Sequence, residues 1–443
     1  MNVAVMKTKA EQAISEAFEA AAGELPGSAT VKERRAEAIG QFSSLGLPHR
    51  RIEEWKYTDL RANLKEAFPP AIHDETPLTI AELIVALGPL AHIDAYRVTF
   101  VNGRHRAKLD DVGEASGLEV AALGSTLASA SDKIVGGLAA KSDGAITALN
   151  TAFMTDGAIV RVADKATLDK PLLVVFVRAG EKKHSVTVRN VISVGAGATA
   201  TIIEAHVVLP GATKEAQSNA LSDVTVGKGA TLHHAKVAVD EAKCVHLANW
   251  NVTLEADATY RGFQFSMGLG LARNEINVVY AGEGGKLDLS GAYLARDGEH
   301  IDTTLVVDHA VPRCESRELF KGVLDGHARG VFQGKIIVRP DAQKTDGKQM
   351  SQALMLSEDA EFDSKPELEI FADDVVCGHG TTSAELDPDL LFYCRSRGIP
   401  ENEARALMIE SFIGEAIDKV EHAELRTALT AFATGWLVRV ARG

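Results

Sequence analysis

Cys377 and His379, a cysteine and a histidine two residues apart, are the pair in this sequence best suited to chemistry. They come after "KPELEIF", which has the composition of a strand, and residues two apart in a strand point to the same face. Their Cα atoms would then lie about 6.5 Å apart, so a thiolate and an imidazole can converge on one soft or borderline metal ion. Two ligands do not complete such a site, because an iron–sulfur cluster usually takes four. The other ligands must come from elsewhere in the chain, from another subunit, or not at all.

Spacing alone favours a structural interpretation of this pair, a buried cysteine beside a histidine that caps a turn. A second polar cluster lies in "DGEHIDTTLVVDHAVPRCESRELFKG". It is compatible with a metal or acid–base site, and equally with the polar outer face of a folded repeat. Its members are His300, Asp302, Asp308, His309 and Glu315.

The remaining cysteines give weaker signals. The chain has four cysteines, widely spaced and without a C-x-x-C, which disfavours a disulfide framework or an all-cysteine metal site within one chain. Cys244 is compatible with packing in a strand. Cys314 lies in a polar loop, where exposure is compatible with its neighbours, and Cys394 shares a helical face with Leu390 and Leu391, which predicts a core position.

Composition and charge exclude several classes of function. Lys plus Arg number 47 and Asp plus Glu number 61, so the formal net charge of −14 argues against a nucleic-acid partner. No apolar run is long enough to span a membrane, and the N-terminus lacks the apolar block of a signal peptide, so we expect a cytoplasmic protein. No G-x-x-x-x-G-K-[ST] occurs, and "ISVGAGATA" lacks the following helix of a dinucleotide site.

A turn-and-strand pattern recurs between residues 95 and 386. Each copy has a small or acidic turn followed by a strand, and no helix is long enough for a βαβ crossover. Steps of this size are typical of a solenoid, so the pattern favours a β-helix over a β-sandwich. The copies are "GAGATATI" at 195, "GKGATLHH" at 227, "EADATYRG" at 255, "GEGGKLDL" at 282, "DGHARGVF" at 325 and "SEDAEFDS" at 357, with steps of 32, 28, 27, 43 and 32.

Helical segments flank this core. Residues 1–94 have helical spacing and contain "HRRIEEWKYTDLRANL"; residues 95–386 form the β-helix core, with a helical insertion near 130–155; residues 387–443 form a C-terminal helical domain. At its start, Asp387 can cap a helix, Pro388 occupies its first position and Gly398 can close it.

The next helix, "ENEARALMIESFIGEAIDKV", has two apolar stripes, more than one core-facing side needs. One interpretation is a helix buried between neighbours. The other is that one stripe packs inward and the second meets a partner. The residues that we expect at a partner surface are Arg405, Leu407, Met408, Ile409, Phe412 and Ile413.

Three long motifs resemble the SufB/SufD family, scaffold subunits of a bacterial iron–sulfur cluster assembly machine, and the similarity is greatest to its SufD branch. They are "RRIEEWKYTDL", "KTDGKQMSQALMLSEDAEFDSKPELEIFADDVVCGHG" and "FYCRSRGIPENEARALMIESFI". The resemblance covers nearly the whole chain. It implies a right-handed parallel β-helix between terminal helical domains, in agreement with the repeat.

The resemblance also implies a function. It implies a scaffold subunit without its own turnover, which pairs with a SufB-like subunit through the β-helix and binds a SufC-like ATPase through the C-terminal helices. His379 would be the ligand that this chain contributes to a transient iron–sulfur cluster shared with SufB, and Cys377 a supporting thiol. The family's association with reduced flavin implies flavin in the full complex, although no flavin motif is present. Gly380 stands where SufB-like chains tend to carry an acidic residue, so we expect no stable cluster on this chain alone.

Two rival hypotheses remain. The first is a β-helix carbohydrate-active enzyme of the secreted type, using the cluster from His300 to Glu315. The second is a purely structural homodimer that only docks the ATPase. The sequence does not decide whether the isolated chain is a homodimer, nor what the motif "RRIEEWKYTDL" does.

Overall fold

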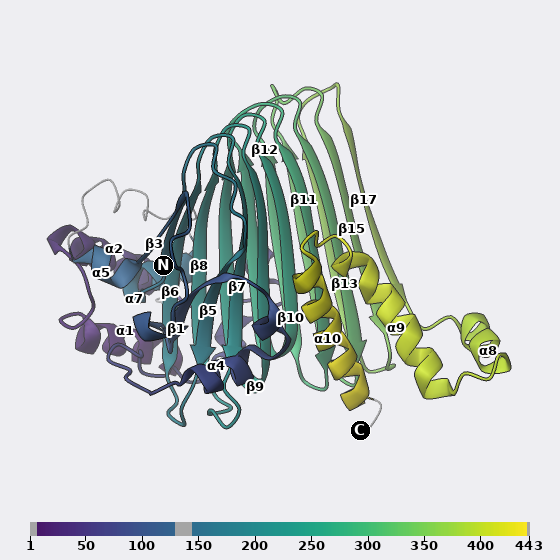
Figure 1. Cartoon of the computed structure of the whole chain (residues 1–443), viewed down its shortest axis with the longest axis horizontal. Coiled ribbons are helices and arrows are strands. Elements are labelled where there is room, and N and C mark those ends of the chain that lie inside the picture. The colour runs from purple at the N-terminus through teal and green to yellow at the C-terminus, as the bar shows by residue number, and fades with distance from the viewer. Residues whose placement is uncertain (1–6, 129–143, 441–443) are drawn as a thin grey trace, which may run out of the picture.

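A long stack of parallel strands forms the centre of the molecule (Figure 1), as seen in a computed structural model that describes residues 7–128 and 144–440. The β-helix core and the flanking helices expected from the sequence are confirmed. The strands are β1 Tyr96–Val101, β2 Arg104–His105, β3 Leu118–Ala122, β4 Ala158–Val162, β5 Leu172–Arg178, β6 Ser185–Val194, β7 Thr199–Val208, β8 Gln217–Val226, β9 Thr231–Leu254, β10 Thr259–Tyr280, β11 Lys286–Arg296, β12 His300–His309, β13 Glu315–Asp325, β14 Arg329–Val338, β15 Asp346–Met355, β16 Glu361–Ile370 and β17 Val376–Ala384.

Two parallel sheets face each other, and each turn of the solenoid adds one strand to each sheet. The first sheet runs through β1, β5, β7, β9, β10, β11, β13, β15 and β17. The second runs through β4, β6, β8, β9, β10, β12, β14 and β16. The long strands β9 and β10 take part in both sheets. We call the space between the two inner faces the lumen.

The pairing register explains the irregular repeat in the sequence. Successive residues of one column in the first sheet are Thr199, Thr231, Thr259 and Lys286, so the coils are 32, 28 and 27 residues long. Glu315, Asp346 and Val376 continue this column with coils of 29, 31 and 30 residues. The expected step of 43 residues was wrong, because the sequence motifs at 282 and 325 belong to turns at opposite edges of the solenoid.

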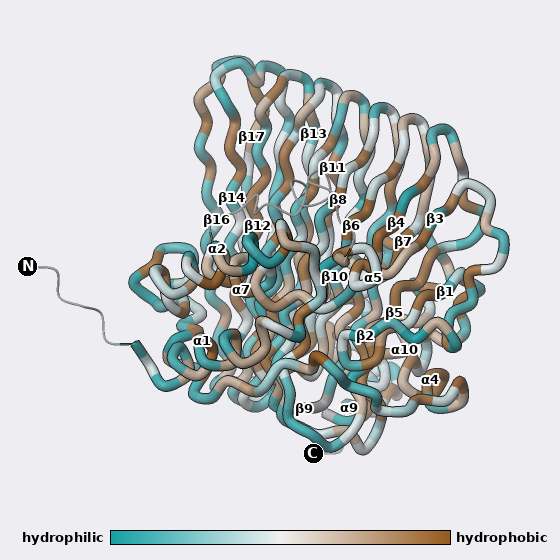
Figure 2. Tube along the Cα trace, turned by 90° about the vertical axis from the view of Figure 1, so that its left-hand side faces the viewer, coloured by the Kyte–Doolittle hydropathy of each residue, from teal (hydrophilic) through white to brown (hydrophobic). Residues whose placement is uncertain are grey.

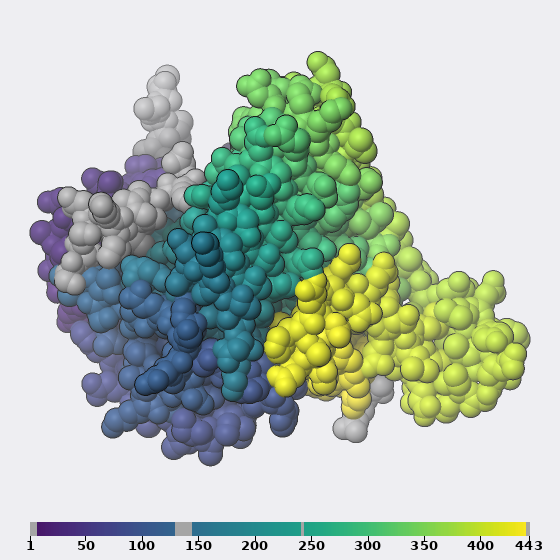
Figure 3. All heavy atoms as spheres, turned by 45° about the horizontal axis from the view of Figure 1, so that its top comes forward, coloured from purple at the N-terminus to yellow at the C-terminus, as the bar shows by residue number. Residues whose placement is uncertain are grey.

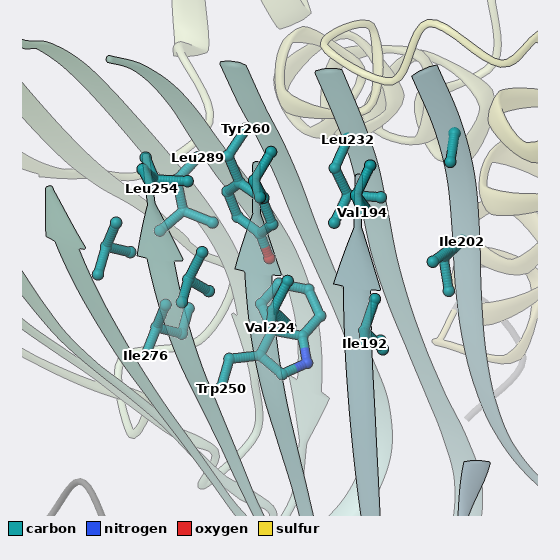
Figure 4. Packing of buried hydrophobic residues seen from close by; sticks show 14 of the residues in the cluster. Ile192, Val194, Ile202, Val224, Leu232, Trp250, Leu254, Tyr260, Ile276 and Leu289 are labelled. Carbon is teal, nitrogen blue, oxygen red and sulfur yellow. The ribbon is translucent and has the colours of Figure 1, made fainter. Parts of the chain in front are cut away.

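Apolar side chains fill most of the lumen (Figure 4). Tyr260, Leu289 and Leu254 point into one packed cluster with Trp250 and Ile276, and all five are almost completely buried. Side chains of a strand alternate between its two faces, so the inward residues of each coil stack on those of its neighbours. Figure 2 shows this alternation as hydrophobic and hydrophilic bands along the strands, with hydrophilic turns at the edge of the stack.

One buried carboxylate in the lumen is fully hydrogen-bonded. Glu204 accepts hydrogen bonds from Ser222 (2.8 Å) and Trp250 (3.1 Å), and lies 2.7 Å from Nε2 of His234. Burial by itself would raise the pKa of Glu204, but the hydrogen bond and charge of His234 outweigh it and lower the pKa to about 2. A charged lumen residue is thus stable where the neighbouring strands supply donors.

The first two helices and the helix at Ala145–Phe153 cover the outer face of the second sheet, whereas the helix at Ile80–Leu87 packs against the first sheet. Thr8 and Glu11 form a capping box at the start of the first helix, and Ser28 caps the second. Phe18 and Phe42 of these helices pack against Phe153 in one buried cluster. The α-helices of this half are α1 Lys9–Ala21, α2 Ala29–Leu45, α3 Leu60–Asn63, α4 Ile80–Leu87, α5 Leu123–Leu127 and α7 Ala145–Phe153, with short 3-10 helices at Glu53–Trp55, Gly88–His92 and Ala107–Leu109.

Residues 49–60, which we call the strap, carry the motif "RRIEEWKYTDL" across the second sheet. The guanidinium of Arg273 in β10 lies 3.8 Å from the ring centroid of Trp55 and donates to the carbonyl of Glu54 at 2.8 Å. Gln333 in β14 donates to the same carbonyl. Lys365 in β16 pairs with Glu53. The motif therefore fixes the N-terminal segment to the second sheet from β10 to β16, which is the last strand of that sheet.

The strap also buries charge on β12. Asp302 is fully buried and is held by the hydroxyl of Thr58 and by the guanidinium of Arg273. His300 lies 2.9 Å from the same hydroxyl. Burial by itself would lower the pKa of the Arg273 guanidinium, but Asp302 and Glu275 raise it. Arg273 of β10 and Asp302 of β12 thus form an internal ion pair, and the strap covers it.

Helices α9 Glu401–Ile417 and α10 Ala423–Val440 lie against the outer face of the first sheet (Figure 1). Helix α8 Pro388–Ser396, which precedes them, extends away from the sheet. The capping prediction is confirmed, because Asp387 accepts from the amides of residues 389 and 390 and Gly398 has a φ of +87°. Ile409 and Ile413 of α9 are buried in the cluster that joins these helices to the sheet.

The expected helical insertion near 130–155 is described only in part, since residues 129–143 lie outside the described residues and α7 occupies Ala145–Phe153. The division into domains 1–94, 95–386 and 387–443 stays a prediction. Among the helices that the structure describes, none is long and apolar enough to cross a membrane.

Candidate functional site at the last coil

The strand β17 ends the solenoid and carries both candidate ligands. It pairs in parallel with β15 on one side, with Gly347 opposite Cys377 and Gln349 opposite His379. Among the described residues, no further coil pairs with its other edge, and β17 forms the end of the stack in Figure 1. An open strand edge offers unpaired backbone groups to another chain.

Cys377 and His379 face the lumen side of this strand. Cys377 packs at the margin of a cluster that includes Ile336 and Val338 of the facing sheet. Cys377 is half-buried and His379 is exposed. Within the described part of the chain, the imidazole makes no hydrogen bond, which leaves it available to a ligand.

Burial raises the pKa of the Cys377 thiol, and the nearby carboxylates of Asp346 and Glu318 raise it further, against a backbone hydrogen bond from Gly347. The thiolate is the form that binds metal, so this cysteine is a weak ligand in the free chain. Cys377 is therefore better suited to a supporting role, and His379 to ligation.

Two columns of inward side chains run from this edge into the lumen. Pairing of β13, β15 and β17 stacks Ser316, Gly347 and Cys377 in one column. The same pairing stacks Glu318, Gln349 and His379 in the next column. The sequence analysis did not find Glu318 or Gln349, because only the register between coils brings them behind His379.

Glu318 has an unusual environment. It is 3% exposed, and neither carboxylate oxygen has a hydrogen-bond partner among the described residues. Burial raises its pKa to about 8, and Ser316 and Arg317 offset this only in part. Gln349, also 3% exposed, has both amide atoms unpartnered. Buried groups with perturbed pKa values or without hydrogen-bond partners are candidates for a functional site.

The acid–base cluster from His300 to Glu315 does not converge. His300 and Asp302 face outward under the strap, whereas His309 faces inward and stacks on Tyr280. Asp308 pairs with Arg339. This arrangement does not support the carbohydrate-active alternative. No three His, Cys, Asp or Glu side chains of the described residues lie close enough together to hold a metal ion by themselves.

The other cysteines are placed differently from the prediction in two cases. Cys314 was expected in a polar loop where it can be exposed, but it is fully buried in the lumen cluster. Cys394 was expected in the core with Leu390 and Leu391, but helix α8 has no buried residue. The error came from helical spacing, which shows that two residues share a face and not what covers it. Cys244 is buried in β9, as expected.

The expected partner surface on α9 is only partly accessible. Leu407 is 52% exposed, whereas Ile409 and Ile413 are buried against the first sheet. Arg405, Met408 and Phe412 are half-buried. Phe412 also stacks against the Lys321 ammonium, whose nitrogen lies 4.4 Å from the ring centroid.

Helix α8 adds exposed apolar side chains that the sequence analysis assigned elsewhere or missed. Leu390, Phe392 and Tyr393 are 48%, 72% and 54% exposed. The helix projects away from the solenoid (Figure 3). Three large exposed apolar residues on one short helix, next to a helix that exposes Leu407, are typical of a surface that another protein covers.

The fold and this site define a class of protein, a two-sheet β-solenoid that presents a thiol and an imidazole at its open end. Two family models cover the chain, "SufBD protein N-terminal region" over residues 8–174 and "SUF system FeS cluster assembly, SufBD core domain" over residues 176–412. The chain belongs to the SufBD family of the SUF iron–sulfur cluster assembly system.

Several relatives support this assignment along most of the chain. The iron–sulfur cluster assembly protein SufD of Escherichia coli is 31% identical over 396 residues, which cover 89% of this chain and 90% of the relative. A SufBD family protein of Synechocystis is 30% identical over 408 residues, with 89% of both chains covered. SufD of Bacillus subtilis is 28% identical over 62% of this chain. The resemblance found in the sequence is thus confirmed.

Proposed function

We propose that this chain is a non-catalytic, cytosolic scaffold subunit that builds iron–sulfur clusters together with a SufB-like subunit. The observation that carries the proposal is the position of Cys377 and His379, which face the lumen on the terminal strand of the solenoid, whose outer edge is open. A second β-helix that docks on this edge would bring its own ligands to the same place. The cluster is then shared between the two chains and is cargo.

His379 is the ligand that we assign to this chain. Its imidazole is exposed and makes no hydrogen bond within the described residues, and imidazole nitrogen is a good ligand for iron. Cys377 is half-buried and its pKa is raised, so it supports the site until bound iron or a partner's charge favours the thiolate.

The test is cluster formation in the assembled complex. The chain is co-expressed with a SufB-like and a SufC-like partner and purified without oxygen, as wild type and as His379→Ala. We expect the variant complex to keep all its subunits and to lose about tenfold in the absorbance of its cluster. Equal absorbance in both complexes would place the ligands entirely in the partner and would support the purely structural alternative.

Helix α8 and the exposed part of α9 form the surface that we propose for the SufC-like ATPase. The residues on this surface are Leu390, Phe392, Tyr393, Arg405, Leu407, Met408 and Phe412. Ile409 and Ile413 are left out because this chain already buries them. ATP hydrolysis belongs to that partner in this proposal.

Aspartate at two exposed positions of α8 is expected to disrupt this docking. Charges at Leu390 and Phe392 would have to be buried in an apolar contact, so the double variant Leu390→Asp/Phe392→Asp should bind the ATPase about tenfold or more weakly. The control is Ile84→Asp/Val85→Asp, which changes two apolar residues of α4 that are 51% and 60% exposed. Calorimetric titration distinguishes the two. An equal loss in both double variants would contradict the assignment of α8.

Flavin is not part of the proposal. The hollow between α1, α7, β6 and β8 has no cationic side chain in its lining that can bind a flavin phosphate. The second hollow, between Phe176 and His246, contains Arg178, but this guanidinium is paired with Asp240. Neither of these two hollows therefore offers an unpaired cation to a flavin phosphate.

A further inference from the structure

We propose that Glu318, Gln349 and His379 form a binding column for a divalent cation, through which a ferrous ion enters the lumen at the last coil. The inference rests on the proposed function for the identity of the ion, but its argument comes from the register of β13, β15 and β17. These three strands place the carboxylate, the amide and the imidazole in one line on the lumen side. His379 lies at the mouth of the column and Glu318 at its base.

The spacing suits a shared ion. Adjacent strands lie about 4.8 Å apart, so the backbones of Glu318 and His379 are about 10 Å apart, with Gln349 between them. Both side chains are long enough for their ligating atoms to approach an ion above Gln349. Carboxylate, amide oxygen and imidazole are a donor set that accepts ferrous ion.

The facing sheet leaves room in the lumen for the amide of Gln349. Gly334 of β14 has no side chain, and a Cβ built there would lie 2.1 Å from the amide nitrogen of Gln349. The glycine therefore leaves the room that the amide occupies. Any larger residue at position 334 would displace Gln349 from the column.

The base of the column is apolar and closed. Leu289 of β11 pairs in register with Glu318 and is fully buried in the lumen cluster. Figure 4 shows Leu289 packed beside Tyr260. A carboxyl group above such a floor, without a hydrogen-bond partner among the described residues, is costly to bury. A cation from the open end would provide the missing partner.

The carboxyl group of Glu318 also favours iron over sulfur as the species that enters the column. Once a cation displaces its proton, the Glu318 carboxylate holds that cation by charge, whereas it offers no such attraction to an anionic sulfide or persulfide. The contrast with Glu204 is informative, because that carboxylate is already satisfied by Ser222, Trp250 and His234. At the β17 end of the lumen, Glu318 has no such partners and is available to bind iron. In this proposal, sulfur reaches the cluster from the partner's side.

The test is ferrous ion binding to the full chain without oxygen, measured by calorimetric titration. We expect the wild type to bind one ion, and Glu318→Gln and His379→Ala to bind it about tenfold or more weakly. Circular dichroism confirms that the variants fold. The matched control is Glu299→Gln, which changes another carboxyl with a raised pKa, but one that lies in the turn between β11 and β12. It should bind like the wild type.

Several outcomes would overturn the inference. One is a wild-type chain that binds no ferrous ion at millimolar concentration, and another is wild-type affinity in Glu318→Gln. A loss in Glu299→Gln as large as that in Glu318→Gln would show a non-specific effect of charge and would also overturn it. If His379→Ala abolishes clusters in the complex while Glu318→Gln binds iron normally, the proposed function stands and this column does not. If Glu318→Gln loses iron while the His379→Ala complex builds clusters normally, the column stands without that function.

Discussion

Replacing Arg273 by alanine is expected to lower the free energy of unfolding by about 4 kcal/mol, because it leaves the carboxylate of Asp302 buried without its ionic partner. Asp302 is 0% exposed and would keep only the hydroxyls of Thr58 and Thr304. The variant also loses the stacking of the guanidinium on Trp55 and its bond to the Glu54 carbonyl. Unfolding in urea measures the loss, and limited proteolysis should show cleavage in the strap.

Two controls separate the buried charge from a general effect of removing arginine. Arg339 pairs with Asp308 at the surface, where it is 51% exposed, so Arg339→Ala should cost no more than about 1 kcal/mol. The double variant Arg273→Met/Asp302→Leu removes both charges and should recover part of the stability. If Arg273→Ala costs no more than Arg339→Ala, the strap is held by something other than this ion pair.

Glu318→Gln is expected to stabilise the free chain, and to do so increasingly as the pH rises from about 5 to about 8. Burial raises the pKa of Glu318 to about 8 in the folded chain, against 4.5 as its ordinary value. Below pH 4.5 the carboxyl is neutral in both states and costs nothing. Above that pH the unfolded chain ionises first, so folding becomes less favourable until the folded pKa is passed. One pKa unit corresponds to about 1.4 kcal/mol, so the difference at pH 8 is of the order of a few kcal/mol.

Thermal unfolding of wild type and variant over this pH range measures the effect. Glutamine keeps the shape of the side chain but does not ionise, so the variant should lack this part of the pH dependence. Glu255→Gln, a change at an exposed turn, serves as the control and should follow the wild type. A constant difference between Glu318→Gln and wild type at all pH values would mean that the carboxylate is satisfied in solution.

The sequence determined the architecture because its signals are local. A turn followed by a strand, repeated along the chain, specifies coils that can only bury their inner faces against each other. The cap at Asp387, the closing Gly398 and the same-face spacing of Cys377 and His379 likewise depend on neighbouring residues, and the structure bears them out. The long motifs were sufficient to recognise the family.

Only the tertiary structure decided which residues meet across coils and which faces are covered. Glu318 lies behind His379 because the pairing register keeps one column through coils of different length, and a slip of one residue in that register would turn the side chain to the other face. The strap could not be placed, since its contacts with Arg273 and Lys365 join segments far apart in sequence. Exposure of Phe392 and burial of Ile413 depend on what packs against each helix, which periodicity alone does not contain.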